Sequence, residues 1–185
     1  GVDWRWFVGL GAEGVLTARG IIAISDYAMA RVRVWLDPFS DPLGDGFQTI
    51  QSFYAIGSGG LFGLGIGKSR QKYLYIPEPQ NDFIFSIVCE EMGFIGACII
   101  ILLFILLIWR GFTIAFKAPD RFSAFVVTGI TAQVAIQTIL NIAVVSNLVP
   151  NTGISPPFFS AGGTSLIMLM FEMGTAFSAS RRAQI

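Results

Sequence analysis

"MGFIGACIIILLFILLIW", residues Met92–Trp109, is a run of 18 residues without a charged side chain. Together with the apolar residues Phe83–Val88, it is long enough for a helix to cross a hydrocarbon core of about 30 Å. Over the whole chain 54% of the residues are hydrophobic and 13% are charged, whereas soluble domains carry about 25% charged residues. The sequence therefore predicts an all-α protein that spans a membrane as a helical bundle.

Three further segments are apolar enough to be predicted spans. They are residues 6–24, 122–149 and 163–180, in addition to 83–109. Glu172 interrupts the last span, and an acid inside a membrane is a functional candidate, although protonation and an amide partner would also satisfy it. Between the first two spans we expect a long outer loop over about residues 37–81, and long loops without structure are uncommon unless they are functional.

Basic residues in short loops predict the orientation, because they favour the cytoplasmic side. They cluster at two places that are two crossings apart: Arg110, Lys117 and Arg121, and then Arg181 and Arg182. Both clusters must lie on one side, which we predict to be cytoplasmic. The segments 37–81 and 150–162 then face outward.

The charge balance and the rare side chains narrow the function. Lys plus Arg and Asp plus Glu both number 12, so no overall basic field favours a nucleic-acid partner. Histidine is absent, which leaves acid–base chemistry to carboxylates. Cys89 and Cys98 lie in one apolar stretch, where a small hydrophobic role is favoured over a disulfide. The N-terminus lacks the pattern of a signal peptide, and we expect the chain to start within a longer protein.

The outer loop is predicted to contain a short helix followed by a glycine-rich turn. Its apolar positions recur at helical spacing, as in a helix that lies in the membrane interface: Phe47, Ile50, Phe53, Tyr54 and Ile56. Glycines follow at positions 57, 59, 60, 63, 65 and 67. They could form a phosphate-binding nest of N–H groups, but close packing of the backbone is favoured, because no strand or phosphate-loop pattern precedes them.

Charged residues end the outer loop. Lys68, Arg70 and Lys72 fall within five residues, and such cations suit either a lipid-linked diphosphate or anionic headgroups in general. Asp82 precedes the next span, at its predicted N-cap, where a carboxylate accepts backbone N–H bonds. The residues alone leave open whether Asp82 caps this helix or does chemistry.

An amide stripe marks the third span. Gln133, Gln137 and Asn141 are spaced by four residues, so they share one face of a helix. Such a stripe avoids lipid and faces either protein or a wet cavity, and a role in helix packing is favoured.

Two long stretches resemble the SEDS family, the FtsW, RodA and SpoVE group of bacterial cell-wall polymerases. They are DPFSDPLGDGFQTIQSFYAIGSGGLFGLGIGKSRQKYLYIPEPQNDFIFSIVCEEMGFIG, residues 37–96, and NIAVVSNLVPNTGISPPFFSAGGTSL, residues 141–166. The resemblance covers about Val34–Arg181, and SRQKYLYIPEPQNDFIF is closer to the division and sporulation branch. It implies a peptidoglycan glycosyltransferase that polymerises lipid II during cell division, sporulation or cell-shape maintenance. It also implies multi-pass placement in the bacterial cytoplasmic membrane, an extracytoplasmic active site and a class B penicillin-binding protein as partner.

The family's essential loop aspartate falls on Asp82, so the resemblance implies that this residue is catalytic. Asp82 would act as a base toward an acceptor sugar hydroxyl, or would hold a divalent cation such as Mg²⁺ or Mn²⁺ at the leaving diphosphate. The remaining candidates for substrate binding are Lys68, Arg70, Lys72, Glu78, Gln48, Gln51 and Ser160.

Two rival functions remain open: a transporter that flips lipid II along the amide stripe and Glu172, and a scaffold that only positions the penicillin-binding protein. The chain departs from the family pattern at three residues, Asn81, Ala161 and Glu172. It also matches only the last four spans of longer family members. The missing front half would supply part of the substrate cavity, so activity is expected to require it.

Overall fold

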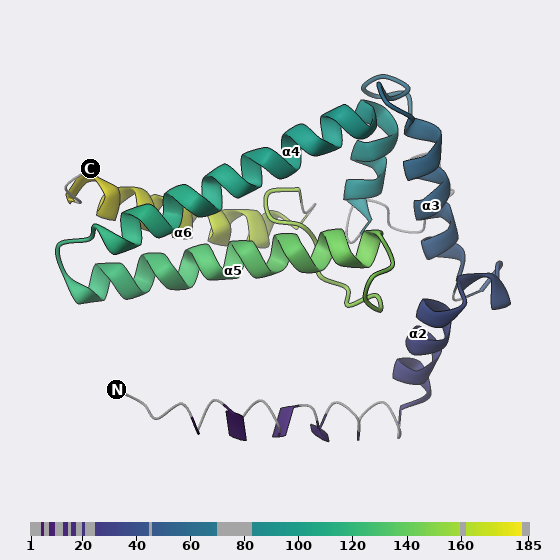
Figure 1. The fold of residues 1–185 in the computed structure, drawn as a ribbon, viewed down its shortest axis with the longest axis horizontal. Helices are drawn as coiled ribbons and strands as arrows, with labels where there is room; N and C mark the ends of the chain where they lie inside the picture. Colours follow the sequence, from purple (N-terminus) through teal and green to yellow (C-terminus); the bar gives the residue numbers. More distant parts are fainter. Residues whose placement is uncertain are drawn as a thin grey trace. The chain divides into compact units, whose positions relative to one another are not determined.

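The computed structural model describes residues 5, 8–9, 13–14, 16–17, 20, 25–44, 46–69, 83–159 and 162–182. All regular secondary structure in these ranges is helical, which confirms the predicted all-α class (Figure 1). The elements are α2 (Asp26–Leu36), the 3₁₀ helix η1 (Pro38–Ser40), α3 (Phe47–Gly59), α4 (Ile84–Phe116), α5 (Arg121–Val145) and α6 (Gly163–Arg182).

The chain divides into two compact units, Gly1–Phe47 and Gln48–Ile185. In the first unit, Ser25 caps α2, because its Oγ accepts the Ala28 N–H at 3.4 Å. Turns form at the two Asp-Pro steps: Asp37 Oδ1 accepts from Phe39 N at 3.1 Å, and Asp41 Oδ1 accepts from Gly44 N at 3.1 Å. The predicted span at residues 6–24 lies largely outside the described residues.

Two helices of the second unit are long and apolar enough to cross a membrane. They are α4, with 33 residues, and α5, with 25 residues, and they coincide with two of the predicted spans within the described part of the chain. The third predicted span, residues 163–180, is helical as α6. Its Glu172 and the basic Arg181 and Arg182 make α6 less apolar, and it does not meet the same criterion for a membrane span.

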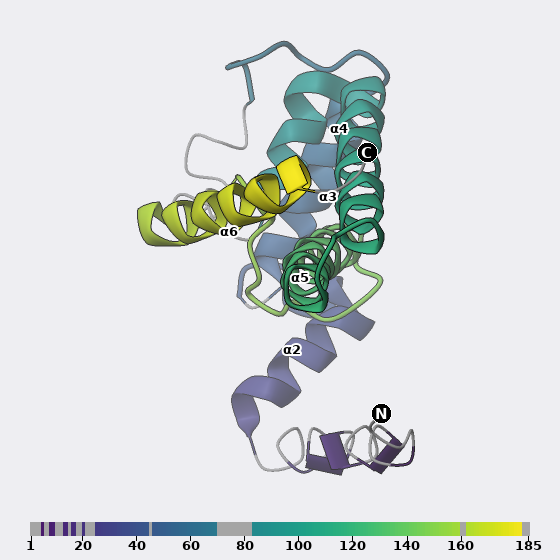
Figure 2. The same cartoon turned by 90° about the vertical axis from the view of Figure 1, so that its left-hand side faces the viewer.

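Helices α4 and α5 run antiparallel and side by side, as both views show (Figures 1 and 2). A Cβ added to Gly111 of α4 would lie 2.4 Å from Thr131 Oγ1 of α5, so the small residue permits the close approach that is common between membrane helices. Helix α6 joins them through a buried cluster of Ala115, Val127 and Ala176.

Asp120 begins α5 by capping it. Its Oδ2 accepts the Ser123 N–H at 2.8 Å and its Oδ1 accepts the Ser123 hydroxyl at 2.9 Å. The backbone hydrogen bond from Ser123, followed by the bond from its side chain, lowers the pKa of the Asp120 carboxyl. Because a carboxylate accepts N–H bonds that a neutral carboxylic acid accepts poorly, the cap is complete only when Asp120 is ionised.

We expect Asp120→Ala to lower the thermal midpoint of the full-length protein by a few degrees at neutral pH, because the cap is lost. The folded-state pKa of Asp120 is depressed, so its stabilisation is present above the unfolded pKa and is lost as pH falls through the folded pKa. The difference between wild type and variant should therefore shrink in acid. Asp120→Asn is the control, since its amide oxygen still caps the helix. A pH-independent difference would contradict the role of the carboxylate.

Helix α4 is broken at Gly93, whose backbone has φ 69° and ψ −171°. Figure 1 shows that the short first part of α4 and the long second part run in different directions. In an unbroken helix the Glu90 and Glu91 carbonyls would accept from the N–H groups of Phe94 and Ile95. Those four groups instead bond to the glycine-rich loop that follows α3.

Four backbone hydrogen bonds join this loop to the break in α4. Leu64 N donates to Glu90 O at 2.9 Å, Gly65 N to Glu91 O at 3.0 Å, Phe94 N to Gly60 O at 2.8 Å and Ile95 N to Leu61 O at 3.2 Å. Non-helical backbone at membrane depth is tolerated only where such partners exist. The loop therefore allows a break within a predicted span.

Glycines make this contact possible. A Cβ on Gly93 would lie 2.3 Å from Gly63 N, a Cβ on Gly63 would lie 2.2 Å from Glu91 O, and one on Gly59 would lie 2.1 Å from Cys89 O. Gly63 and Gly93 also have positive φ angles of 77° and 69°, which cost a residue with a side chain free energy. The interpretation of the glycines as close-packing residues is confirmed at these positions.

Candidate functional site

Several predicted site residues lie outside the described residues: Arg70, Lys72, Glu78, Asp82 and Ser160. Their roles therefore stay predictions. The structure does describe the two residues that flank the segment 70–82, which are Ser69 and Phe83. Both are buried, with 0% and 2% of their surface exposed.

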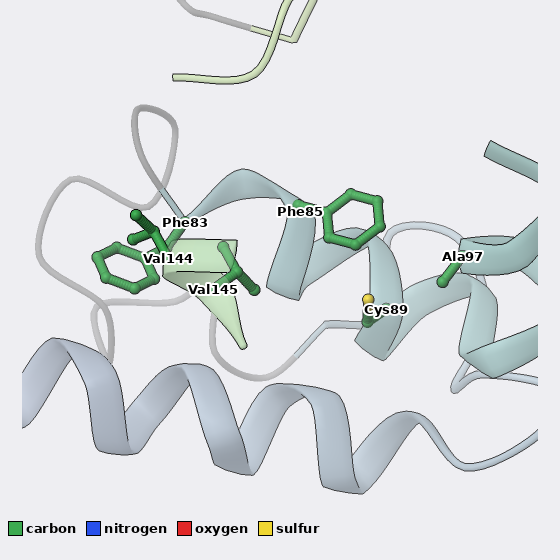
Figure 3. Close-up of a cluster of buried hydrophobic side chains, with 6 residues drawn as sticks. All are labelled: Phe83, Phe85, Cys89, Ala97, Val144 and Val145. Carbon is green, nitrogen blue, oxygen red and sulfur yellow. The ribbon is translucent and has the colours of Figure 1, made fainter. Parts of the chain in front are cut away.

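Phe83 is held where the start of α4 meets the end of α5. Figure 3 shows its ring beside Val144 and Val145, and these side chains belong to one buried cluster with Phe85 and Cys89. Burying a phenylalanine side chain contributes about 1.5–3 kcal/mol. The residue that follows Asp82 in the chain therefore has a fixed place in the bundle.

The predicted N-cap position at Asp82 is one residue too early. Helix α4 begins at Ile84, and Phe83 occupies the N-cap position without a capping hydrogen bond from its own side chain. Asp82 lies outside the described residues, so the bonds of its carboxylate stay a prediction. The Phe83 carbonyl instead accepts the Ser86 N–H at 3.0 Å and the Ser86 hydroxyl at 2.6 Å. Burial of Phe83 sets the helix start one residue later than the sequence indicated.

Lys68 lies at the exposed end of the glycine-rich loop. Its N–H donates to Gly65 O at 3.0 Å, which closes a turn. The next residue, Ser69, donates a hydrogen bond from its Oγ to Glu90 Oε2 on α4. Only 1% of Glu90 is exposed, so the loop is attached to α4 by a buried carboxyl group next to the exposed cation.

Helix α3 confirms the predicted short helix, and its larger apolar residues do not all face the protein. The buried residues are Thr49, Ile50, Ser52, Ala55 and Gly59. Tyr54 and Ile56 are 55% and 37% exposed, because small side chains face the protein and larger ones face outward, as membrane helices favour. The candidates Gln48 and Gln51 are half-buried on this helix.

The three residues of the amide stripe have different surroundings: Asn141 is packed inside the protein, and Gln133 and Gln137 line a pocket. Asn141 is 1% exposed and its Nδ2 donates to Ile154 O at 2.9 Å, which confirms a packing role. Gln133 and Gln137 line a pocket of about 150 Å³ together with Glu172. The other residues of its wall are Ser155, Pro156, Pro157, Phe158, Ser165, Leu166, Met168 and Leu169.

The connection between α5 and α6 folds back onto the helices. The rings of Phe158 and Phe159 each lie 6.4 Å from the ring of Phe104 in α4. Pro156 and Pro157 are buried. The predicted outer segment 150–162 therefore does not simply extend away from the bundle, and its described part forms one wall of the pocket.

Other predictions concern metals and cysteines. The described residues contain no group of three His, Cys, Asp or Glu side chains that could hold a metal ion. Cys89 and Cys98 are both free thiols, as predicted.

Sequence reasoning missed Glu90 and Ser69. The available signal was an acid at the start of an otherwise apolar span, since intramembrane carboxylates usually have a specific partner.

Comparisons with known proteins place this geometry in a family. Residues 1–185 match the cell-cycle protein family of FtsW, RodA and SpoVE. The chain is 51% identical to stage V sporulation protein E of Bacillus subtilis (strain 168), over 95% of this chain and 48% of that protein. It is 40% identical to a probable peptidoglycan glycosyltransferase FtsW of Geobacter sp. (strain M18), over 98% of this chain and 50% of that protein.

Solved structures agree. One solved structure matches with a TM-score of 0.73 and 34% identity, over 98% of this chain and 51% of that chain. It comes from work on the structural coordination of polymerization and crosslinking by a peptidoglycan synthase complex. A RodA mutant of Thermus thermophilus shares the fold at a TM-score of 0.56 and 23% identity, over all of this chain and 60% of that one. The chain belongs to the FtsW, RodA and SpoVE family of membrane proteins, and resembles its FtsW and SpoVE members. It spans about half the length of the curated relatives it matches.

Proposed function

We propose that the protein containing this chain polymerises lipid II into peptidoglycan strands, with Asp82 as its catalytic base. Membership of a family whose relatives include probable peptidoglycan glycosyltransferases supports the activity. The observation that carries the site is the burial of Phe83 between α4 and α5. It fixes the backbone directly after the aspartate that the family resemblance singles out.

In the proposed reaction, the Asp82 carboxylate removes the proton from an acceptor sugar hydroxyl of one lipid II molecule. The oxygen then bonds to the anomeric carbon of the other chain, whose bond to the diphosphate breaks. Undecaprenyl diphosphate leaves with the electron pair. General-base assistance of this kind contributes about 10²–10⁴-fold, and Lys68, Arg70 and Lys72 would stabilise the charge on the leaving diphosphate.

A divalent cation is the alternative role for Asp82. Mg²⁺ needs near-octahedral coordination, usually by one or two carboxylates together with water and phosphate oxygens. The described residues supply no group of three ligands, and Asp82 itself lies outside them. Asp82 and the substrate diphosphate would be the ligands of the cation.

The rival function, transport of lipid II, has one observation in its favour. Gln133, Gln137 and Glu172 line one pocket, and Glu172 Oε2 is buried without a hydrogen-bond partner among the described residues. The pocket holds about 150 Å³, whereas ligand sites commonly have about 300–1,000 Å³. The pocket within this chain is smaller than such sites, and the names of the relatives favour polymerisation.

The two functions give different results with the purified full-length protein and lipid II. A polymerase makes glycan chains in detergent, where no membrane separates two sides. A transporter moves lipid II across vesicles and makes no chains. Failure to form chains with a class B penicillin-binding protein present would overturn the proposed function.

The placement and partner are part of the same proposal. Asp82 and its loop would face the outside of the bacterial cytoplasmic membrane, since basic residues of the α4–α5 connection and the end of α6 favour the inside. A class B penicillin-binding protein would be the partner, and the likeness to a synthase complex for polymerization and crosslinking supports this choice.

The outer cations give a prediction. Lys72→Gln should reduce kcat/KM for lipid II by about tenfold or more, because a hydrogen bond to a charged phosphate contributes roughly 1.5–3 kcal/mol. The amount of folded protein should change little. Lys117→Gln is the matched control, since Lys117 is exposed in the α4–α5 connection. Equal effects of both variants would mean that the outer cations only contact headgroups.

A further inference from the structure

One side-chain hydrogen bond joins the glycine-rich loop to α4 in addition to the backbone hydrogen bonds between them. Four backbone hydrogen bonds and the contact between Gly63 and Gly93 already hold the loop at the helix break. Beyond them, Ser69 Oγ donates to Glu90 Oε2, and the two residues are 0% and 1% exposed. Burying a carboxyl group is costly even when it is hydrogen-bonded, so this pair calls for a role of its own.

Ser69 of this pair directly follows the exposed Lys68 in the chain. The Lys68 N–H closes a turn onto Gly65 O at 3.0 Å, and its side-chain carbons lie 3.4–4.0 Å from where a Gly65 Cβ would stand. Gly65 N in turn donates to Glu91 O of α4 at 3.0 Å. The backbone of Lys68 is therefore held by its own hydrogen bond to Gly65 and by the bond that the next residue, Ser69, makes to Glu90.

A cation held in this way is preorganised. A free lysine side chain loses up to about 1.5–2 kcal/mol of rotamer freedom when it is ordered, and a fixed backbone keeps its ammonium group within a smaller volume. Preorganised charges stabilise a developing negative charge better than mobile ones, because little reorganisation is needed during the reaction.

We propose that Glu90 is a positioning residue of the glycosyltransferase: through Ser69 it fixes the backbone at Lys68, whose ammonium group meets the diphosphate of the lipid-linked substrate. The proposal rests on the proposed polymerase function. In this proposal Lys68, which the structure describes, contacts the diphosphate, and the buried Glu90 positions Lys68. Glu90 itself does not touch the substrate.

The test uses the full-length protein with its penicillin-binding partner and measures kcat/KM for lipid II. Lys68→Gln, Ser69→Ala and Glu90→Ala should each lower it by roughly tenfold, the scale of one charge-assisted bond. Glu90→Gln should retain activity within about threefold, because its amide oxygen still accepts the Ser69 hydrogen bond. Ser58→Ala is the matched control, since the Ser58 hydroxyl donates to Ala55 O within α3, and it should leave kcat/KM unchanged.

Double variants separate positioning from general support of the fold. If Glu90 and Ser69 act through Lys68, adding Ser69→Ala or Glu90→Ala to Lys68→Gln should cause no further loss. A structural role would multiply the losses to about 100-fold, and that result would overturn the proposal. So would full activity of Ser69→Ala or of Lys68→Gln. Ser69→Ala carries the test if Glu90→Ala does not fold.

These outcomes are distinct from failure of the proposed function. If Asp82→Asn abolishes polymerisation while Ser69→Ala is fully active, only the positioning role of Glu90 fails. If Asp82→Asn polymerises normally, the proposed catalytic base fails first.

Discussion

Replacing Asp82 with asparagine in the full-length protein is expected to lower the rate of glycan polymerisation by at least about 10²-fold, the usual scale for loss of a general base. Asparagine has nearly the same shape and still accepts hydrogen bonds, but it cannot remove a proton or bind a cation strongly. The measurement is the formation of glycan chains from lipid II by the protein with its penicillin-binding partner.

The structure makes this test sharper than the sequence alone would. Phe83 occupies the N-cap position of α4, so we expect the helix to tolerate the replacement of Asp82. Expression and thermal stability of Asp82→Asn should therefore match wild type. A folded Asp82→Asn protein that polymerises at a near-normal rate would remove Asp82 from the mechanism.

Replacing Gly93 with alanine is expected to lower the free energy of unfolding by at least about 2 kcal/mol, the scale of a strained positive-φ residue with added contacts. The new Cβ would lie 2.3 Å from Gly63 N and 2.7 Å from Leu61 O. Both atoms belong to backbone, so neither can move without loosening the loop from α4. Thermal unfolding in detergent and polymerase activity should decline together.

Gly129→Ala is the matched control for Gly93→Ala. Gly129 lies within α5, and a Cβ there would meet no atom within 4 Å. Alanine is favoured over glycine inside a helix by roughly 0.5–1 kcal/mol, so this variant should be at least as stable as wild type. If Gly93→Ala were equally stable, the close contact between loop and helix would not be needed for folding.

The candidate site was only partly predictable from the sequence. The close-packed glycines and the short helix were predicted correctly, because glycine clusters and helical spacing are local patterns, whereas the role of the cations stays a prediction. The sequence did not indicate which apolar residues of α3 face the protein: Ile50 is buried at 4% exposure while Tyr54 is 55% exposed. In water the larger apolar residues would face the protein, but in lipid an apolar side chain is equally well placed on either side.

The sequence by itself predicted α4 and α5 as two helices long and apolar enough to cross a membrane, because length and lack of charge are local properties. It also identified Asp82, through a resemblance that extends along nearly the whole chain. Only the tertiary structure decided that α4 breaks at Gly93, that Phe83 is its N-cap residue, and that Glu90 accepts a hydrogen bond from Ser69. Residues 60–69 and 83–95 make these features together, and no local pattern reveals which distant backbone groups replace the hydrogen bonds of a broken helix.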